Sequence, residues 1–111
     1  FAWALGIFEG EGCLTYVTTE DKWRMSVEMT DMDVLWSFYE AIGGVGNLNG
    51  LRKRPSAPEH YKPTGCWATA ARKTINELLI RFYPYMHERR RKKCNEFFAW
   101  YHKKNETSNR R

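Results

Sequence analysis

Residues 3–12 read Trp-Ala-Leu-Gly-Ile-Phe-Glu-Gly-Glu-Gly, and this stretch is the most informative part of the sequence. We expect a short helix over about residues 1–11. Gly6 and Gly10 stand four residues apart, with Ala2 four residues before them, so all three lie along one side of this helix. A glycine in a helix interior costs up to about 1 kcal/mol. A stripe without side chains lets a second backbone approach closely, which indicates that this helix packs against another helix.

Two carboxylates end the same stretch, Glu9 and Glu11, and each is followed by a glycine. If the helix pairs with a copy of itself, a carboxylate at its end lies beside its twin. Two such carboxylates can hold divalent metal, and metal ions about 4 Å apart stabilise both the attacking and the leaving oxygen in phosphodiester hydrolysis. The stretch therefore raises the hypothesis of a metal-dependent phosphodiesterase site on a twofold axis.

The size and composition of the chain indicate one globular domain. Its 111 residues, 42% hydrophobic and 15% aromatic, are enough to bury a core, and we place the domain at residues 1–104 with a polar tail at 105–111. Without an apolar run of about 18 residues or a signal-peptide pattern, we expect a soluble, intracellular protein with no membrane partner. Three widely spaced cysteines without CxxC spacing indicate reduced structural thiols and argue against a zinc site.

The charge of the chain favours a polyanionic partner. Its 18 Lys and Arg residues exceed its 13 Asp and Glu residues, for a formal net charge of +5. Ten of the 18 basic residues fall in three clusters, at residues 52–54, 89–93 and 110–111. Any one of these runs can be a solvated helix face, but three clusters in one small domain favour a nucleic acid.

Strict alternation marks residues 23–30, where the odd positions are apolar and the even positions polar. This period is typical of a strand with one face on a core and the other in water or on a ligand. Residues 13–19 alternate less cleanly and predict the partner strand of a hairpin whose turn is 20–22. A second hairpin is expected from strands at 45–54 and 64–70.

Three more helices are expected. Thr30 or Asp31 caps the first, which ends at Gly43-Gly44; the others cover about 72–82 and 86–104. The order is then αββαββα with a second C-terminal helix. This is an α+β arrangement in which helices cover one face of an antiparallel sheet.

Residues 4–12 resemble the LAGLIDADG motif of homing endonucleases, with Ala4-Leu5 at the position of the leading Leu-Ala and glutamate as both acids. The Gly-Val-Gly-Asn-Leu run at 44–48 and Pro84-Tyr85-Met86 followed by basic residues are also similar to that family, so the resemblance spans roughly 1–104. It implies the αββαββα fold with a four-stranded, antiparallel, saddle-like sheet. A single motif per chain implies a homodimer, with an expected interface at Ala2, Leu5, Gly6, Glu9 and Gly10.

The resemblance also implies an active site. Glu11, with the carbonyl of Gly10, is the expected ligand of Mg²⁺, for which Mn²⁺ or Ca²⁺ can substitute in binding, and Glu9 is expected to support the helix end. Asp31 falls where the family places a polar residue that organises water or metal, although a plain helix cap explains it equally well. Arg89 falls at the position of a basic residue near the active site; its pKa above about 12 favours electrostatic assistance over proton transfer, and a solvated face is the alternative.

The exposed face of the sheet is the expected DNA-reading surface, because a twisted antiparallel ribbon fits the major groove. Its predicted DNA contacts are Thr15, Val17, Thr19, Arg24, Ser26, Glu28, Thr30, Asn47, Asn49, Arg52 and Arg54, with Cys66 and Ala68 as further candidates. Basic residues outside this set are expected to hold phosphates without reading sequence: Lys53, Arg90, Arg91, Lys92 and Lys93.

Together these implications describe a homing endonuclease: a homodimeric, Mg²⁺-dependent nuclease that hydrolyses both strands of a specific double-stranded DNA site. Two alternatives use the same fold. The chain could be an intron RNA maturase whose basic surface binds structured RNA, or a DNA-binding regulator without catalysis. A purely structural dimerisation module leaves the basic clusters unexplained.

Overall fold

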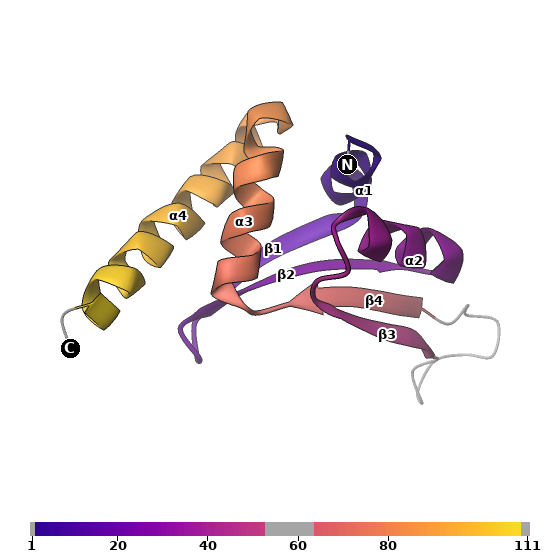
Figure 1. Ribbon diagram of the computed structural model, residues 1–111, viewed down its shortest axis with the longest axis horizontal. Coiled ribbons are helices and arrows are strands. Elements are labelled where there is room, and N and C mark those ends of the chain that lie inside the picture. The colour runs from indigo at the N-terminus through magenta and orange to yellow at the C-terminus, as the bar shows by residue number, and fades with distance from the viewer. Residues whose placement is uncertain (1, 53–63, 110–111) are drawn as a thin grey trace.

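The computed structural model describes residues 2–52 and 64–109 (Figure 1). It confirms the predicted α+β class and the order of the elements. Along the chain these are α1 (Ala2–Glu11), β1 (Gly12–Val17), β2 (Lys22–Met29), α2 (Met32–Ala41), β3 (Asn47–Arg52), β4 (Thr64–Thr69), α3 (Arg72–Phe82), the short 3-10 helix η1 (Tyr83–Tyr85) and α4 (Glu88–Asn109). Within these ranges, no helix combines the length and the apolar character needed to cross a bilayer.

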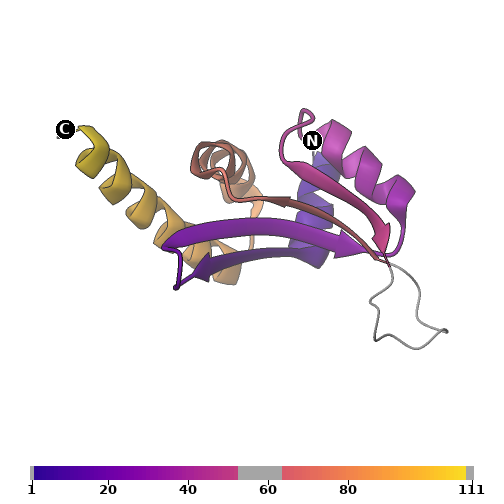
Figure 2. The same ribbon diagram turned by 90° about the horizontal axis from the view of Figure 1, so that it is seen from below.

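The four strands form one antiparallel sheet in the order β1-β2-β4-β3. Helices α1, α2 and α3 lie on the same side of this sheet, and α4 runs past its end (Figures 1 and 2). The alternation predicted for β2 is confirmed, because Trp23, Met25 and Val27 are buried on the helix-covered side. The opposite face of the sheet is left uncovered by the described helices.

Aromatic side chains fill the space between helices and sheet. Phe38 of α2 meets Trp67 of β4 edge-on, with ring centroids 5.1 Å apart, and Phe8 of α1 stacks on Phe82 of α3 at 5.7 Å. Burying a side chain of this size contributes about 1.5–3 kcal/mol. These contacts hold α2 against the sheet and α1 against α3, and thereby set the position of the residues at the ends of α1 and α2.

Helix α2 begins and ends as its sequence predicts. Asp31 is the N-cap, since its Oδ1 accepts hydrogen bonds from the backbone N–H groups of Asp33 and Val34. At the other end Gly43 and Gly44 have φ of 96° and 70°, a left-handed conformation that glycine adopts without steric cost.

Several boundaries differ from the prediction. Strand β1 ends at Val17, so Thr19 lies in the turn, and β3 begins at Asn47 because the carbonyl of Val45 accepts a hydrogen bond of 2.8 Å from the indole of Trp67. Helix α4 continues to Asn109, five residues past the expected end near 104. This last stretch contains no glycine or proline to stop it.

Candidate active site and nucleic-acid interface

Glu11 is the last residue of α1, and its side chain is exposed. The next residue, Gly12, must be a glycine: a Cβ there would lie 2.5 Å from the carbonyl oxygen of Phe8, too close for any side chain. The chain therefore passes from α1 into β1 through a tight turn. Glu11 lines an open cleft of about 730 Å³ together with residues of β2, β4 and α2, among them Glu28, Thr30 and Thr64.

The donor atoms at this turn suit a hard divalent cation. The Glu11 carboxylate is accessible, and the carbonyl of Gly10 belongs to the last turn of α1, where helical carbonyls lack an intrahelical partner. Carboxylate and carbonyl oxygens are the ligands that Mg²⁺ and Ca²⁺ prefer. Among the described residues, however, no three His, Cys, Asp or Glu side chains are grouped to hold a metal ion, so these two donors fit a metal as part of a larger ligand set.

The glycine stripe of α1 faces away from its own chain. A Cβ built on Gly6 or on Gly10 would meet nothing within 4 Å, and Ala2 in the same row is exposed. Nothing in this subunit therefore requires glycine at these positions. Two other residues expected at the dimer interface, Leu5 and Glu9, are half-buried against their own subunit.

Glu9 points toward the start of α4. Its Oε2 lies 3.9 Å from Nε2 of His87, and its Oε1 is buried without a hydrogen-bond partner in the part of the chain that the structure describes. The support of the end of α1 by Glu9 stays a prediction.

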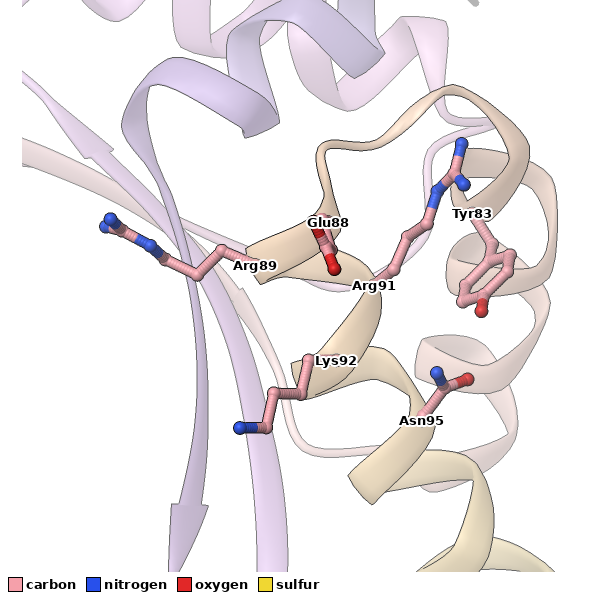
Figure 3. A pocket seen from close by; sticks show the side chains of 6 residues that line it. All are labelled: Tyr83, Glu88, Arg89, Arg91, Lys92 and Asn95. Carbon is pink, nitrogen blue, oxygen red and sulfur yellow. The ribbon is translucent and has the colours of Figure 1, made fainter.

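The two other predicted catalytic residues occupy exposed positions. Asp31 caps α2, and both of its cap hydrogen bonds are accepted by one oxygen, Oδ1. Arg89 lies in the first turn of α4, beside a shallow cleft between η1 and α4. Figure 3 shows Arg89 and Lys92 extending to one side of α4. Arg91 extends to the other side, where it donates to the Pro84 carbonyl at 2.9 Å and lies over the ring of Tyr83.

Arg90 corrects the expectation that the whole basic run binds phosphates. Its guanidinium is half-buried and points inward, donating through Nη2 to the carbonyl of Gly12 at 2.8 Å and to that of Glu9 at 3.3 Å. It also lies 5.2 Å from the centroid of Phe8. Arg90 lies on the same side of α4 as the buried residues Cys94 and Phe97. This helical spacing is the sequence signal that could have assigned Arg90 to the interior.

The uncovered face of the sheet carries most of the predicted DNA contacts. The strand register places Cys13, Ser26, Ala68 and Asn47 in one row across all four strands, and Glu28, Cys66 and Asn49 in the next. Seven of the predicted contacts are exposed: Thr15, Thr19, Arg24, Glu28, Thr30, Asn47 and Asn49. Val17 is half-buried, as are the further candidates Cys66 and Ala68.

Two details of this face differ from the sequence expectation. Ser26 is only 8% exposed because it lies between Cys13 and Ala68, so little of its hydroxyl is accessible to a ligand. Arg24 donates to Sγ of Cys66 at 3.6 Å. Cys13 and Lys22 also lie on this face, because the register pairs Cys13 with Ser26 and Lys22 with Val17. Neither residue was predicted as a DNA contact.

The remaining predicted contacts are only partly covered by the structure. Arg52 ends β3, paired with Thr64. Lys53 and Arg54 lie outside the described residues. Lys92 and Lys93 are exposed on α4, and Lys93 pairs with Glu96 at 3.5 Å.

No family model and no curated protein matches the sequence. Solved structures do match the fold. The group I intron-encoded homing endonuclease I-CeuI, complexed with DNA, aligns with a TM-score of 0.69 at 18% identity over 97% of this chain. The archaeal intron-encoded homing endonuclease I-Vdi141I, also complexed with DNA, aligns at 0.58 and 16% over 97%. The homing endonuclease I-CvuI in complex with its target aligns at 0.63 and 17% over 89%.

The chain spans 56%, 68% and 64% of the lengths of these three proteins. At these identities the likeness concerns the fold. It agrees with the resemblance of residues 4–12 to the LAGLIDADG motif and with the four-stranded sheet that carries α1, α2 and α3 on one side. The chain therefore has the LAGLIDADG homing endonuclease fold.

Proposed function

We propose that the chain is a homing endonuclease that cuts a specific double-stranded DNA site as a homodimer with a divalent metal. The observation that carries this proposal is the construction of α1. Its glycine stripe is open along its whole length, and the stripe leads directly to the exposed carboxylate of Glu11. A twofold-related α1 packed on Gly6 and Gly10 brings two Glu11 side chains toward the same axis.

In this proposal each subunit supplies half of the metal-binding donors, the Glu11 carboxylate and the Gly10 carbonyl. Bound Mg²⁺ would supply positive charge to the scissile phosphate and to the attacking oxygen. Complexes of I-CvuI with DNA in the presence of 2 mM Ca and, with the DNA not cleaved, of 2 mM Mg support the use of a divalent metal. Asp31 lies at the start of α2 and would orient water near this centre. Arg89 would add positive charge without exchanging a proton.

The uncovered sheet face would read the DNA sequence. Arg24, Asn47, Asn49 and Glu28 present side chains suited to guanine, to adenine and to the amino group of cytosine. Lys92 and Arg89 on α4 would contact phosphates, which sets affinity and salt dependence but not specificity. The formal net charge of +5 and the DNA-bound state of the structural neighbours both support double-stranded DNA as the partner.

The first experiment is selection from a randomised duplex library. The protein and Mg²⁺ are incubated with the library, and the ends of cut duplexes are sequenced. Recovery of pseudo-palindromic sites with a fixed central break supports the proposal. Sites that are bound and left uncut would favour a DNA-binding regulator. If duplexes are neither bound nor cut, structured intron RNA becomes the next substrate to test.

A matched variant assigns the chemistry. Glu11→Gln keeps the size and hydrogen-bonding capacity of the side chain and removes its charge, so we expect it to bind the selected duplex with unchanged affinity and not to cut it. Glu28→Gln, which removes a carboxylate from the same cleft, is the control and is expected to shift sequence preference with cleavage retained. Wild-type cleavage by Glu11→Gln would refute the role of Glu11.

A further inference from the structure

Arg90 connects α4 to the turn that carries Glu11. Its Nη2 donates to the carbonyls of Glu9 and Gly12, at 3.3 and 2.8 Å. These acceptors lie on either side of Glu11 along the chain, one before it by two residues and one after it by one. A single guanidinium therefore bridges the last turn of α1 and the first residue of β1.

The environment of Arg90 suits this bridge. The last carbonyls of a helix lack intrahelical partners and carry the negative end of the helix dipole, so a cation placed there is favourable. The guanidinium also lies over the ring of Phe8, at 5.2 Å from its centroid, and the side chain is half-buried. A planar guanidinium can serve two acceptors while it stacks on an aromatic ring, which an ammonium group on a flexible stem does less well.

The side chains near Arg90 in the sequence do not duplicate this contact. His87 approaches the carboxylate of Glu9, at 3.9 Å, and leaves the backbone of the turn untouched. Arg91 is bound to the Pro84 carbonyl and Tyr83, on the other side of α4 (Figure 3). Lys92 is exposed and extends away from Tyr83 (Figure 3).

We propose that Arg90 is a positioning residue, which holds the turn from α1 to β1 so that the Glu11 carboxylate and the Gly10 carbonyl stay arranged for a divalent cation. The inference rests on the proposed metal-dependent function. It separates Arg90 from the rest of the basic run: the exposed residues of α4 contribute affinity for DNA, and Arg90 contributes affinity for the cation.

The test compares Arg90→Gln and Arg90→Lys with Lys92→Gln, a charge-matched change two residues away. Two measurements need no DNA target: hydrogen exchange of the backbone amides of residues 9–13, and binding of Tb³⁺ to the protein, followed by luminescence sensitised by tryptophan. A third is the Mn²⁺ concentration that gives half-maximal cleavage of the selected duplex.

We expect Arg90→Gln to speed exchange in residues 9–13 and to raise the half-saturating Tb³⁺ and Mn²⁺ concentrations by about 10-fold or more, the range typical for residues that orient metal ligands. Arg90→Lys should recover part of both effects. Lys92→Gln should leave the exchange and the Tb³⁺ affinity unchanged. It should weaken DNA binding and make the loss of binding with salt less steep, because it removes one phosphate contact. Arg90→Lys also keeps the positive charge and most of the stem, so it decides the question if Arg90→Gln does not fold.

Wild-type exchange and wild-type cation affinity in the Arg90 variants would overturn the inference. So would a loss of thermal stability in Arg90→Gln without any change confined to residues 9–13. A failure of the proposed function would give a different result. A wild-type protein that cuts no duplex and binds no Tb³⁺ would refute the metal site. The exchange data would then still decide whether Arg90 holds the turn.

Discussion

Replacing Gly6 and Gly10 together by alanine separates the stability of one chain from the association of two. In this subunit a Cβ at either position would meet nothing within 4 Å. Alanine should therefore stabilise α1 by its helix propensity alone, about 0.5–1 kcal/mol per position. The free energy of unfolding of a single chain should rise, by as much as about 2 kcal/mol for both changes.

The effect on the proposed dimer has the opposite sign. In a twofold interface each substitution adds a methyl group to both copies of α1. Extra methyl groups in a close-packed contact cost about 1–3 kcal/mol each time. Even one such cost per subunit adds up to about 2–6 kcal/mol per dimer, which weakens dimerisation by roughly 30-fold or more, since 1.4 kcal/mol is a factor of about 10.

Sedimentation equilibrium measures the dimer, and chemical denaturation at a concentration where the wild type is monomeric measures the single chain. Ser37→Ala, on the exposed side of α2, is the control: it also raises helix propensity and should leave dimerisation unchanged. A Gly6→Ala, Gly10→Ala double variant that dimerises as tightly as the wild type would refute the close approach of two α1 helices. A wild type that stays monomeric at every concentration would refute the homodimer.

Two further predictions concern other parts of the chain. Asp21 bonds with Lys104, Tyr16 and Trp100, and chiefly the Lys104 bond holds the pKa of this carboxylate well below its usual range. A carboxylate with a lowered pKa stabilises the fold above its unfolded value of about 4. Asp21→Asn should therefore lower the melting temperature at pH 7, and the gap to the wild type, followed by thermal denaturation, should shrink as the pH falls below about 4; a gap independent of pH would contradict this. Cys13 is exposed on the uncovered sheet face, whereas Cys94 is 1% exposed and burial raises the pKa of its thiol to about 11. A maleimide at pH 7 should modify the exposed Cys13 faster than the half-buried Cys66 and spare Cys94, and the Cys13 adduct should weaken DNA binding in a gel-shift assay; Cys13→Ser should bind normally and lose the fast phase of modification.

Much of the fold could be predicted because it follows from local periodicity. Apolar and polar residues alternate along β2. Its apolar odd positions therefore predicted the buried face of the sheet, and its polar even positions predicted the uncovered face. Helical spacing of apolar residues predicted both the position of α3 and the side that it buries, which carries Ile75, Leu78, Leu79 and Phe82. These features depend on neighbours in sequence, which a single chain displays directly.

The features that could not be predicted depend on partners far away in sequence. Trp100 donates to Asp21 across 79 residues, and Arg90 reaches the carbonyl of Gly12 across 78. The start of β3 is displaced by the Trp67 indole, 22 residues from the Val45 carbonyl that it binds. Within the run of five basic residues, Arg90 has the same charge as its neighbours, and only its helical spacing from Cys94 and Phe97 distinguishes it as the arginine that turns inward.

Helix α1 combines two demands that conflict in a single subunit. Its buried side, with Ala4 and Phe8 fully inaccessible, holds it to the domain through the stack on Phe82. Its other side lacks side chains at Gly6 and Gly10, which weakens the helix by up to about 2 kcal/mol. Burial of Phe8, about 1.5–3 kcal/mol, is of the size needed to offset that loss. The domain can therefore keep a helix of poor intrinsic stability, and this explains how the stripe remains open to a second helix while Arg90 and Gly12 hold Glu11 at its end.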